Sequence, residues 1–390
     1  MTEAGARILT IFSPSWRGGA GRFVREMSVA IAASGVRTTL ISPLAEPETE
    51  DAGHFGVERI YLAQGKAGQG SIFARALGAL GRVARTFPLL ARQRRISPWY
   101  LVTMTDWLPV KLLQFMWIRL LGGRLIYVVH DATPHAWTFP RPLQGLEGAM
   151  LRWSYHLATQ LVTLTGAAAR ELENRYGIVR QRISIIPHGA YHSGTPQPMR
   201  GDNIVLVFGM LRRNKRTLET IEAMQLLPED SPLRLIIAGV PHADDPGYWQ
   251  ECQAALRHGH ARIHTEIGFV SDERVAQLLD ECDAMILPYE DFNSASGVAS
   301  LGVFSERLLL CTDVGSMGEL IEGGLEPLAV ARPVTALSVL DALKAFADLP
   351  VQTRRDMAAR SRAALTEHLS WQRIGKLYQA LLSDQPGTGA

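Results

Sequence analysis

Cysteine is scarce in this chain: among 390 residues only Cys252, Cys282 and Cys311 occur. Their spacing fits no zinc or redox motif, and an odd number argues against a framework of disulfide bonds. The chain also lacks any run of about 18 or more apolar residues, so we expect no membrane-spanning helix. The short apolar segment near the start becomes polar too soon for a signal peptide. Together these absences favour a protein of the reducing cytoplasm.

A strong charge of one sign is missing as well. The formal net charge is only +2, which is not the basic surplus of a nucleic-acid-binding protein. No Asp-x-Asp motif follows a predicted strand, where a metal-bound diphosphate would lie. We therefore expect neither a nucleic-acid partner nor a metal site.

What the chain does have is a regular alternation of strand-like and helix-like segments. Continuous β-branched runs separated by helices indicate parallel strands covered on both faces, hence doubly wound α/β domains. A polar, proline-containing segment at residues 192–203 interrupts the alternation, as linkers do. We predict one domain at residues 1–195, a second at 196–365, and a terminal helix and tail at 366–390 that packs back towards the first. The predicted strands are Arg7–Phe12, Thr38–Ile41, Leu125–Val129, Leu161–Leu164, Ile183–Ile186, Ile204–Phe208, Leu233–Ala238, Arg262–Ile267, Ala284–Leu287 and Leu308–Thr312.

One segment is unusually basic. Between Lys66 and Asp106 there is no acidic residue, and apolar residues recur at spacings of three or four from Phe73 to Phe87. This pattern predicts a basic amphipathic helix, which suits an anionic membrane surface. An ordinary core helix with a solvated face would show the same pattern. The candidates for the acceptor and membrane side are Arg75, Arg82, Arg85 and Arg92.

In the first half, candidate ligand-binding residues follow two predicted strands. A loop containing Gly18 and Gly19 joins the first strand to a helix predicted from about Arg22, and backbone N–H groups in such a loop can approach an anion. The loop lacks the G-x-G-x-x-G spacing of dinucleotide-binding proteins. His130 and Asp131 come directly after another strand, where side chains face the ligand crevice of a parallel sheet. His130 can therefore hydrogen-bond a sugar hydroxyl or a phosphate.

In the second half, cations and small residues follow two more strands. Gly209 ends one strand, and Arg212 and Lys215 follow before a helix, where a guanidinium fork and an ammonium group suit a diphosphate. After the strand ending at Leu287, hydroxyls, a glycine and a helix start form a second anion cradle. The candidates there are Ser294, Ser296, Gly297 and Val298, with Glu290 and Asp291 as partners for ribose hydroxyls.

These motifs, in this order, resemble those of the retaining glycosyltransferases of family 4. The resemblance extends from about Arg7 to Leu382. It implies the GT-B architecture, in which two Rossmann-like, doubly wound parallel-sheet domains face a central cleft. The stretches that carry it are Gly18–Glu26, His130–His135, Ile185–Gly189, Phe208–Lys215, Ser296–Val298, Thr312–Gly315, Glu319–Leu320 and Leu369–Trp371.

The resemblance also implies a role for each candidate. Gly18 and Gly19 would lie near the donor phosphates and the acceptor, and His130 would contact the transferred sugar. Arg212 and Lys215 would bind the diphosphate and stabilise the charge of the leaving group. No covalent nucleophile and no cofactor are expected, because the nucleotide sugar is itself a substrate. The remaining donor-binding candidates are Asp131, Gly209, Glu290, Asp291, Ser294, Ser296, Gly297 and Val298.

One departure from the family pattern concerns ribose recognition. The usual pair of glutamates around the donor helix is missing, and the aligned positions hold Ser294 or Asn293, and Gly302. This leaves ribose recognition to other carboxylates. The candidates are Glu290, Asp291 and Glu306.

The expected reaction is transfer of a hexose, with retention, from a nucleotide sugar to a lipid-linked or growing saccharide in exopolysaccharide or glycolipid biosynthesis. The His-Asp variant resembles that of bacterial polysaccharide mannosyltransferases, so GDP-mannose is the first donor expected and a UDP-sugar the next. The expected place is the cytoplasmic face of the membrane. Two alternatives stay open: an enzyme like the nucleotide-sugar epimerases, and a catalytically silent subunit, which the missing glutamate pair would support.

Overall fold

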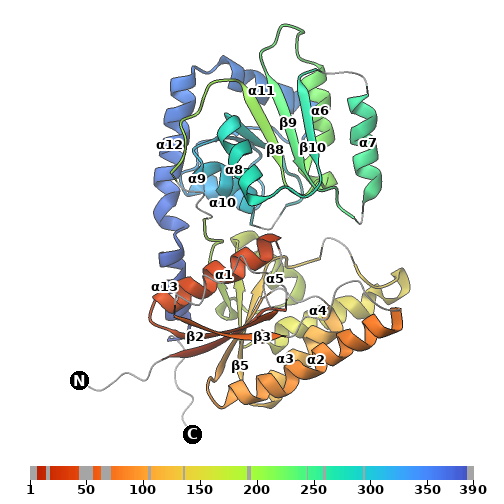
Figure 1. The fold of residues 1–390 in the computed structure, drawn as a ribbon, viewed down its shortest axis with the longest axis vertical. Helices are drawn as coiled ribbons and strands as arrows, with labels where there is room; N and C mark the ends of the chain where they lie inside the picture. Colours follow the sequence, from red (N-terminus) through yellow and green to blue (C-terminus); the bar gives the residue numbers. More distant parts are fainter. Residues whose placement is uncertain are drawn as a thin grey trace, which may run out of the picture. The chain divides into compact units, whose positions relative to one another are not determined.

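The computed structural model describes residues 7–14, 18–43, 56–62, 72–103, 107–134, 137–190, 195–243, 245–257, 261–292 and 295–383. The chain forms two compact units, each built on one parallel sheet (Figure 1). The first unit combines Met1–Gly189 with Ser370–Ala390, and the second is Ala190–Leu369. No helix among the described residues is both long and apolar enough to cross a membrane.

The first unit has a seven-stranded sheet in the order β3-β2-β1-β4-β5-β6-β7. The order reverses between β1 and β4, and such a switch point is where open α/β sheets place their ligands, beyond the carboxyl ends of the strands. Its strands are β1 Ile8–Phe12, β2 Arg37–Pro43, β3 Val57–Leu62, β4 Trp99–Val102, β5 Arg124–Val129, β6 Gln160–Thr163 and β7 Ile183–Ile185. Its helices are α1 Gly18–Ala33, α2 Ile72–Arg94, α3 Leu108–Leu120, α4 Gln144–Leu157, α5 Gly166–Tyr176 and α13 Trp371–Leu381.

Helices cover this sheet in two groups. Four helices, α2 to α5, share one buried cluster with the sheet, to which they contribute Leu90, Phe115, Leu151 and Leu172 in turn. Helices α1 and α13 pack on each other (Figure 1). A Cβ added to Gly375 of α13 would lie 2.1 Å from the carbonyl oxygen of Ala30 in α1, so the two backbones touch. The last helix of the chain is therefore part of the unit that the start of the chain forms.

The second unit has a six-stranded sheet in the order β10-β9-β8-β11-β12-β13. Alternate residues of its central strands enter separate clusters, with Ile286 and Leu310 in one and Met285 and Leu309 in the other, so both faces are buried. Its strands are β8 Ile204–Phe208, β9 Arg234–Gly239, β10 Ile263–Ile267, β11 Ala284–Leu287, β12 Leu308–Cys311 and β13 Leu328–Ala329. Its helices are α6 Thr217–Gln225, α7 Pro246–Leu256, α8 Asp272–Glu281, α9 Gly297–Phe304, α10 Ser316–Glu322, α11 Ala336–Asp348 and α12 Val351–His368.

The prediction of doubly wound parallel-sheet units is confirmed, and all ten predicted strands occur. Three further strands were not predicted: in β3 the charged residues Glu58 and Arg59 interrupt the apolar run, whereas β4 and β13 are very short. The expected start of the first helix at about Arg22 was wrong. Helix α1 begins at Gly18, so the paired glycines form its first turn rather than a loop before it.

Candidate functional site

Two strand-end turns of the second unit are packed backbone against backbone. Gly209 follows β8 with φ +102°, and its N–H donates to the carbonyl oxygen of Ala238 at 2.9 Å. Gly239 ends β9 with φ +146°, and a Cβ there would lie 1.8 Å from the carbonyl oxygen of Gly209. Positive φ favours glycine at both positions, and the close approach excludes any side chain at Gly239. The turn predicted to approach a diphosphate is thus built from glycine on two neighbouring strands.

Three predicted donor residues meet at this turn. A Cβ added to Gly209 would lie 3.4 Å from Cγ2 of Val298 and 3.5 Å from Nζ of Lys215. The Lys215 ammonium also lies 5.2 Å from the centroid of the buried Tyr289 ring. Burial, and secondly the positive charge of Arg212, lower the pKa of Lys215 to about 8. Such an ammonium gains stabilisation when an anion enters beside it.

Helix α9 directs its first turn towards the same residues. Ser296 is its N-cap and is buried, and the side-chain oxygen accepts from the N–H of Ala299 at 3.2 Å. The hydroxyl keeps its own proton to donate. Gly297 and Val298 are the first residues of the helix, where N–H groups have no acceptor within the helix and the dipole favours an anion. The N-terminus of α9 therefore has the features of an anion-binding site.

The three arginines that follow β8 differ in what they contact. Arg213 forms ion pairs with Glu251 at 2.8 Å and Asp245 at 3.3 Å, and Arg216 pairs with Glu219 at 2.7 Å and also with Glu290. The side chain of Arg212 is partly exposed. Its Nε donates a weak hydrogen bond to the sulfur of Met210 at 3.2 Å. Among the described residues, no carboxylate pairs with Arg212 or Lys215.

The carboxylates expected near ribose are placed differently from one another. Glu290 accepts from the N–H of Val334 at 2.8 Å as well as from Arg216, and these contacts hold its pKa below the ordinary value. Glu306 is paired with Arg362 at 2.9 Å. Asp291 is exposed, has φ +49°, and is not ion-paired with any described residue. Asp291 is thus the candidate whose carboxylate is least engaged, whereas Ser294 lies outside the described residues.

The position aligned with the second family glutamate faces the core. A Cβ on Gly302 would lie 2.7 Å from Cδ2 of Leu309 and 2.9 Å from the sulfur of Met285, both of which are buried. An acidic side chain there would displace the core and lose its hydration. The missing glutamate is therefore consistent with how this helix packs.

In the first unit, His130 follows β5 and lies in an aromatic cluster. Its Nε2 is 3.3 Å from the hydroxyl of Thr103, and its ring centroid is 4.9 Å from that of Phe23. His188 lies 5.0 Å from the same Phe23 ring, which also contacts Trp371 at 5.9 Å. Burial, followed by the neighbouring His188 and opposed by Asp131, lowers the pKa of His130 to about 4. His130 is therefore a neutral hydrogen-bonding group at neutral pH.

His188 and Trp371 were not predicted as site residues. Burial lowers the pKa of His188 to about 4, and its Nδ1 lies 2.7 Å from the carbonyl oxygen of Gly189. A Cβ on Gly189 would lie 2.3 Å from the Trp371 ring, so only glycine fits beneath that ring. The Pro-His-Gly and Ser-Trp motifs were part of the family resemblance, and their contact with the His130 cluster is the structural reason to include them.

Hydrogen bonds from two helices fix the turn after His130. Tyr155 of α4 donates to the carbonyl oxygen of Ala132 at 2.7 Å. Thr133 donates to Glu171 of α5 at 2.6 Å, and its hydroxyl lies 2.8 Å from that of Tyr176. Asp131, which directly precedes Ala132, is exposed. The turn is therefore anchored directly after the histidine.

The other predicted residues of the first unit are only partly described. Gly18 and Gly19 open α1 after β1. On α2, Arg85 and Arg92 are exposed, whereas the side chains of Arg75 and Arg82 lie outside the described part of the structure.

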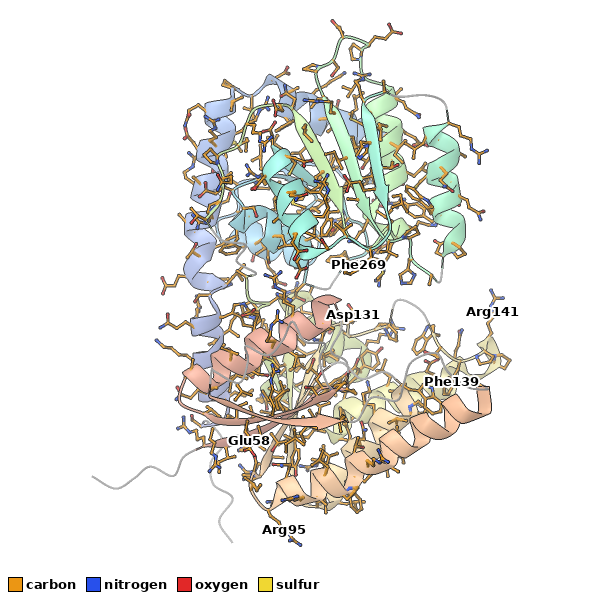
Figure 2. The ribbon with its side chains drawn as sticks, in the orientation of Figure 1. Glu58, Arg95, Asp131, Phe139, Arg141 and Phe269 are labelled. Carbon is orange, nitrogen blue, oxygen red and sulfur yellow. The ribbon has the colours of Figure 1, made fainter. Side chains whose placement is uncertain are left out.

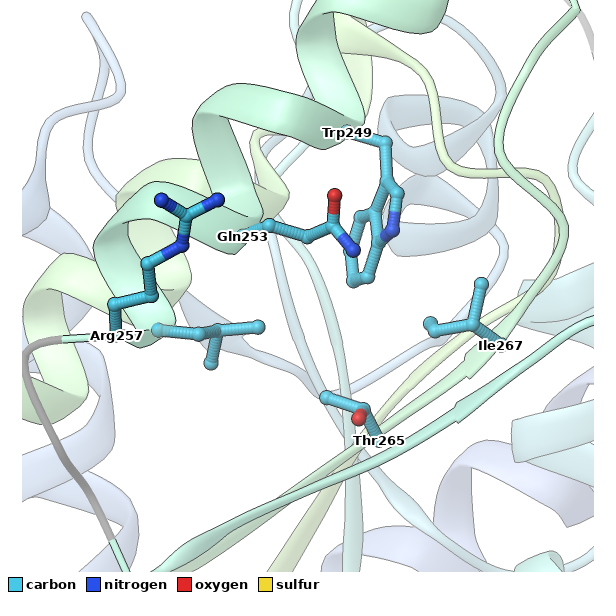
Figure 3. A pocket seen from close by; sticks show the side chains of 6 residues that line it. Trp249, Gln253, Arg257, Thr265 and Ile267 are labelled. Atoms are coloured by element: carbon cyan, nitrogen blue, oxygen red, sulfur yellow. The ribbon is translucent and has the colours of Figure 1, made fainter.

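A cavity of 390 Å³ lies between α7 and β10, away from these candidates. Figure 3 shows the ring of Trp249 and the side chains of Gln253, Arg257, Thr265 and Ile267 around it; Leu256 completes the lining. None of the predicted donor residues lines it. Among the residues that the structure describes, no group of three or more His, Cys, Asp or Glu side chains could hold a metal ion.

Comparisons with known proteins agree with this architecture. Sucrose-phosphate synthase from Thermosynechococcus elongatus is 14% identical with a TM-score of 0.71, covering 97% of this chain and 100% of that chain. The HepE protein of Anabaena, in complex with UDP and glucose, is 13% identical with a TM-score of 0.73 and the same coverages. WaaG, a glycosyltransferase involved in lipopolysaccharide biosynthesis, is 14% identical with a TM-score of 0.64, again over 97% and 100%. No curated protein sequence matches.

Family matches divide along the chain in the order of the two predicted domains. Residues 17–192 match the family described as Glycosyltransferase Family 4. Residues 196–362 match the family described as Glycosyl transferases group 1. With two parallel-sheet units of the Rossmann type and these two matches in sequence, the chain belongs to the GT-B glycosyltransferases of the family 4 type.

Proposed function

We propose that this glycosyltransferase moves a hexose, with retention, from a nucleotide sugar to a lipid-linked or growing saccharide in exopolysaccharide or glycolipid biosynthesis. The observation that supports it best is the meeting of Lys215 and Val298 at the glycine turn of Gly209. An ammonium whose pKa is already low, a helix start and a bare backbone together suit a diphosphate. Arg212 lies three residues before Lys215 and is not ion-paired with any described carboxylate.

In the proposed reaction the second unit holds the donor diphosphate. Lys215, Arg212 and the first N–H groups of α9 stabilise the charge that develops as the bond from the anomeric carbon to the phosphate oxygen breaks. The acceptor hydroxyl forms the new bond on the same face of the sugar, and its proton passes to the departing phosphate oxygen. His130, neutral at the working pH, contributes a hydrogen bond to the sugar and carries no charge. Catalysis then consists of positioning and electrostatic stabilisation.

Two nucleotide sugars with different bases are the candidate donors. The His-Asp variant favours GDP-mannose, whereas the HepE structures contain UDP and UDP-glucose. Ribose recognition is assigned to Asp291, because Glu290 and Glu306 are engaged in ion pairs within the second unit.

The proposed place of action is the cytoplasmic face of a membrane. The three cysteines are free and buried, which suits a reducing compartment. The arginines of α2, namely Arg75, Arg82, Arg85 and Arg92, are proposed to face anionic headgroups near the acceptor.

A catalytically silent subunit is the second candidate. The observation that favours it is Gly302, which leaves no room for the second family glutamate. An epimerase-like enzyme is less favoured, because proton shuttling needs carboxylates and histidines, and Asp131 is the one acid among the site residues predicted in the first unit.

The test measures thermal stabilisation by GDP, UDP, ADP and their common sugars, followed by turnover of the nucleotide sugar that binds. A ligand that binds only the folded state raises the melting temperature. We expect a shift with one base, reduced in Lys215→Ala and Arg212→Ala but kept in Arg213→Ala, whose side chain is held by Glu251 and Asp245. Binding without turnover of any sugar would favour the silent subunit, and the absence of any shift would contradict the donor site.

A further inference from the structure

Three neighbouring helices of the first unit expose no carboxylate. The sequences of α2, α3 and α4 contain one acidic residue, Glu147, and it is only 3% exposed. Its carboxylate accepts from the backbone N–H groups of Thr138 at 3.0 Å and Phe139 at 2.8 Å. Glu147 is therefore occupied inside the unit, and the outer surface of these helices has basic and apolar side chains without acids.

Helix α3 presents an apolar stripe away from the sheet. Phe115 and Ile118 are buried on one side of it. Leu113, Met116 and Leu120, spaced to share the opposite side, are 54%, 38% and 77% exposed. An amphipathic helix that only covered the sheet would carry polar residues at these positions.

Helix α4 has a matching stripe. Leu151 and Tyr155 face the core, whereas Leu146 and Trp153 on the other side are 55% and 63% exposed. Leu143, just before the helix, is 49% exposed. Large side chains exposed to this degree and in this number mark an interaction site rather than ordinary surface.

The two stripes lie beside a basic helix. Helix α3 packs against α4 and against α2, where Trp117 donates from Nε1 to the carbonyl oxygen of Phe87 at 2.9 Å. On and after α2, Arg85, Arg92 and Arg95 are exposed. Figure 2 shows Arg95 and Arg141 reaching outward at opposite ends of this layer of helices. Apolar side chains are thus bordered by arginines without competing acids.

We propose that the outward face of α3 and α4 is the part of this enzyme that enters an anionic lipid bilayer. This apolar face consists of Leu113, Met116, Leu120, Leu143, Leu146 and Trp153. The apolar side chains and the tryptophan lie at the boundary between headgroups and acyl chains, while the arginines contact anionic headgroups.

The inference deepens the proposed function, on which it rests for the lipid-linked acceptor, because it assigns the bilayer to α3 and α4 in addition to the arginines of α2. Membrane binding needs no turnover, so it is tested separately from catalysis.

The experiment measures flotation of the full chain with phosphatidylcholine vesicles, with and without phosphatidylglycerol. The double variant Leu146→Glu with Trp153→Glu should bind anionic vesicles about tenfold more weakly, because two side chains lose their apolar burial. The matched control is Leu337→Glu on α11 of the second unit, where the leucine is 64% exposed; its binding should equal that of the unchanged chain. Thermal stabilisation by nucleotides should be the same in all three proteins.

Insertion itself is read from quenching of tryptophan fluorescence by brominated lipids. Trp153→Phe should keep vesicle binding and lose most of the quenching. Equal vesicle binding by the double variant and the control would overturn the proposal, as would an unchanged chain that binds no vesicles. Self-association without lipid that the double variant abolishes would also overturn it, by assigning the face to a second copy of the chain.

Discussion

At the scale of single residues, the burial of Lys215 lowers its pKa, and this affects both the stability of the protein and its binding of a charged ligand. The ammonium lies beside an aromatic ring and close to the turn of Gly209, and its pKa is lowered to about 8 by burial and by Arg212. Because the folded pKa lies below the ordinary lysine value of 10.5, the unfolded chain holds this proton more tightly. The ligand-free protein should therefore gain stability as the pH rises through this interval.

The same titration predicts pH-dependent binding. The affinity for the nucleoside diphosphate should fall as the pH rises above about 8, because a neutral amine offers no charge to the phosphates. Isothermal titration at several pH values around this pKa measures the effect. Lys215→Met should bind at least about tenfold more weakly at neutral pH and show little of this dependence. An unchanged dependence in Lys215→Met would assign it to a different group.

Single residues also show what could be predicted from sequence. Gly209, Lys215 and Val298 were expected near a diphosphate from the strand-to-helix pattern, and the structure brings them together. The pairing of Glu290 with Arg216 was not foreseeable, since the two residues are 74 positions apart and sequence pattern says nothing of such distant contacts. Whether each candidate contacts a donor stays a prediction.

At the scale of elements, the glycine turns offer a matched comparison. Gly239 ends β9 and Gly268 directly follows β10, with φ values of +146° and +145°. A Cβ at Gly239 would collide with the Gly209 backbone, whereas nothing lies within 4 Å of one at Gly268. Gly268→Ala should lower the free energy of unfolding by about 1 to 2 kcal/mol through backbone strain. Gly239→Ala should cost at least about 2 kcal/mol more and abolish nucleotide binding. Urea unfolding and the thermal shift assay measure both, and equal losses in the two variants would contradict the close contact.

The anchored turn after His130 gives a second prediction. Tyr155 donates to the carbonyl oxygen of Ala132 at 2.7 Å, and Tyr100 donates to that of Leu90 at 2.6 Å, both as buried phenols in the same unit. Replacing either by Phe should reduce stability by about 1 kcal/mol. Only Tyr155→Phe should lower kcat, by about tenfold, because it loosens the turn that positions His130. Steady-state kinetics decide this, and equal kcat values for the two variants would show that the turn does not need this anchor.

Strand prediction succeeded where composition is unambiguous. Ile204–Phe208 and Ala284–Leu287 are continuous apolar runs and were predicted with the observed limits. Strand β3 was missed because Glu58 and Arg59 interrupt its apolar pattern at the edge of the sheet. The helix start at Gly18 was missed because glycine has low helix propensity, and the surrounding structure overrides that preference.

At the scale of the whole molecule, the terminal helix completes the first unit. Gly375 of α13 lets the backbone of α1 approach, since a Cβ there would meet the carbonyl oxygen of Ala30 at 2.1 Å. Gln379 of the same helix donates to the carbonyl oxygen of Ser34 at 2.5 Å. The buried side chains of Ile374 and Tyr378 show that α13 contributes to the core of this unit.

Gly375→Ala should therefore lower the free energy of unfolding by about 2 to 3 kcal/mol, because the two helices must move apart. The control is Gly145→Ala on α4, where nothing lies within 4 Å of the added carbon and the change should be neutral or stabilising by up to about 1 kcal/mol. Denaturant unfolding measures both. Equal stability of the two variants would show that α1 and α13 tolerate a wider spacing.

The place of α13 has a consequence for synthesis on the ribosome. The second unit is one continuous stretch, Ala190–Leu369, and every residue it needs has been translated before α13 is made. The first unit must wait for Ser370 and the residues after it, although its sheet is synthesised first. At about 5 to 20 residues per second, translation leaves this unit without its last helix for roughly ten seconds or more. The unit that is encoded first is thus completed last. During translation the nascent chain passes through a stage in which the apolar surface of α1 is not yet covered by α13.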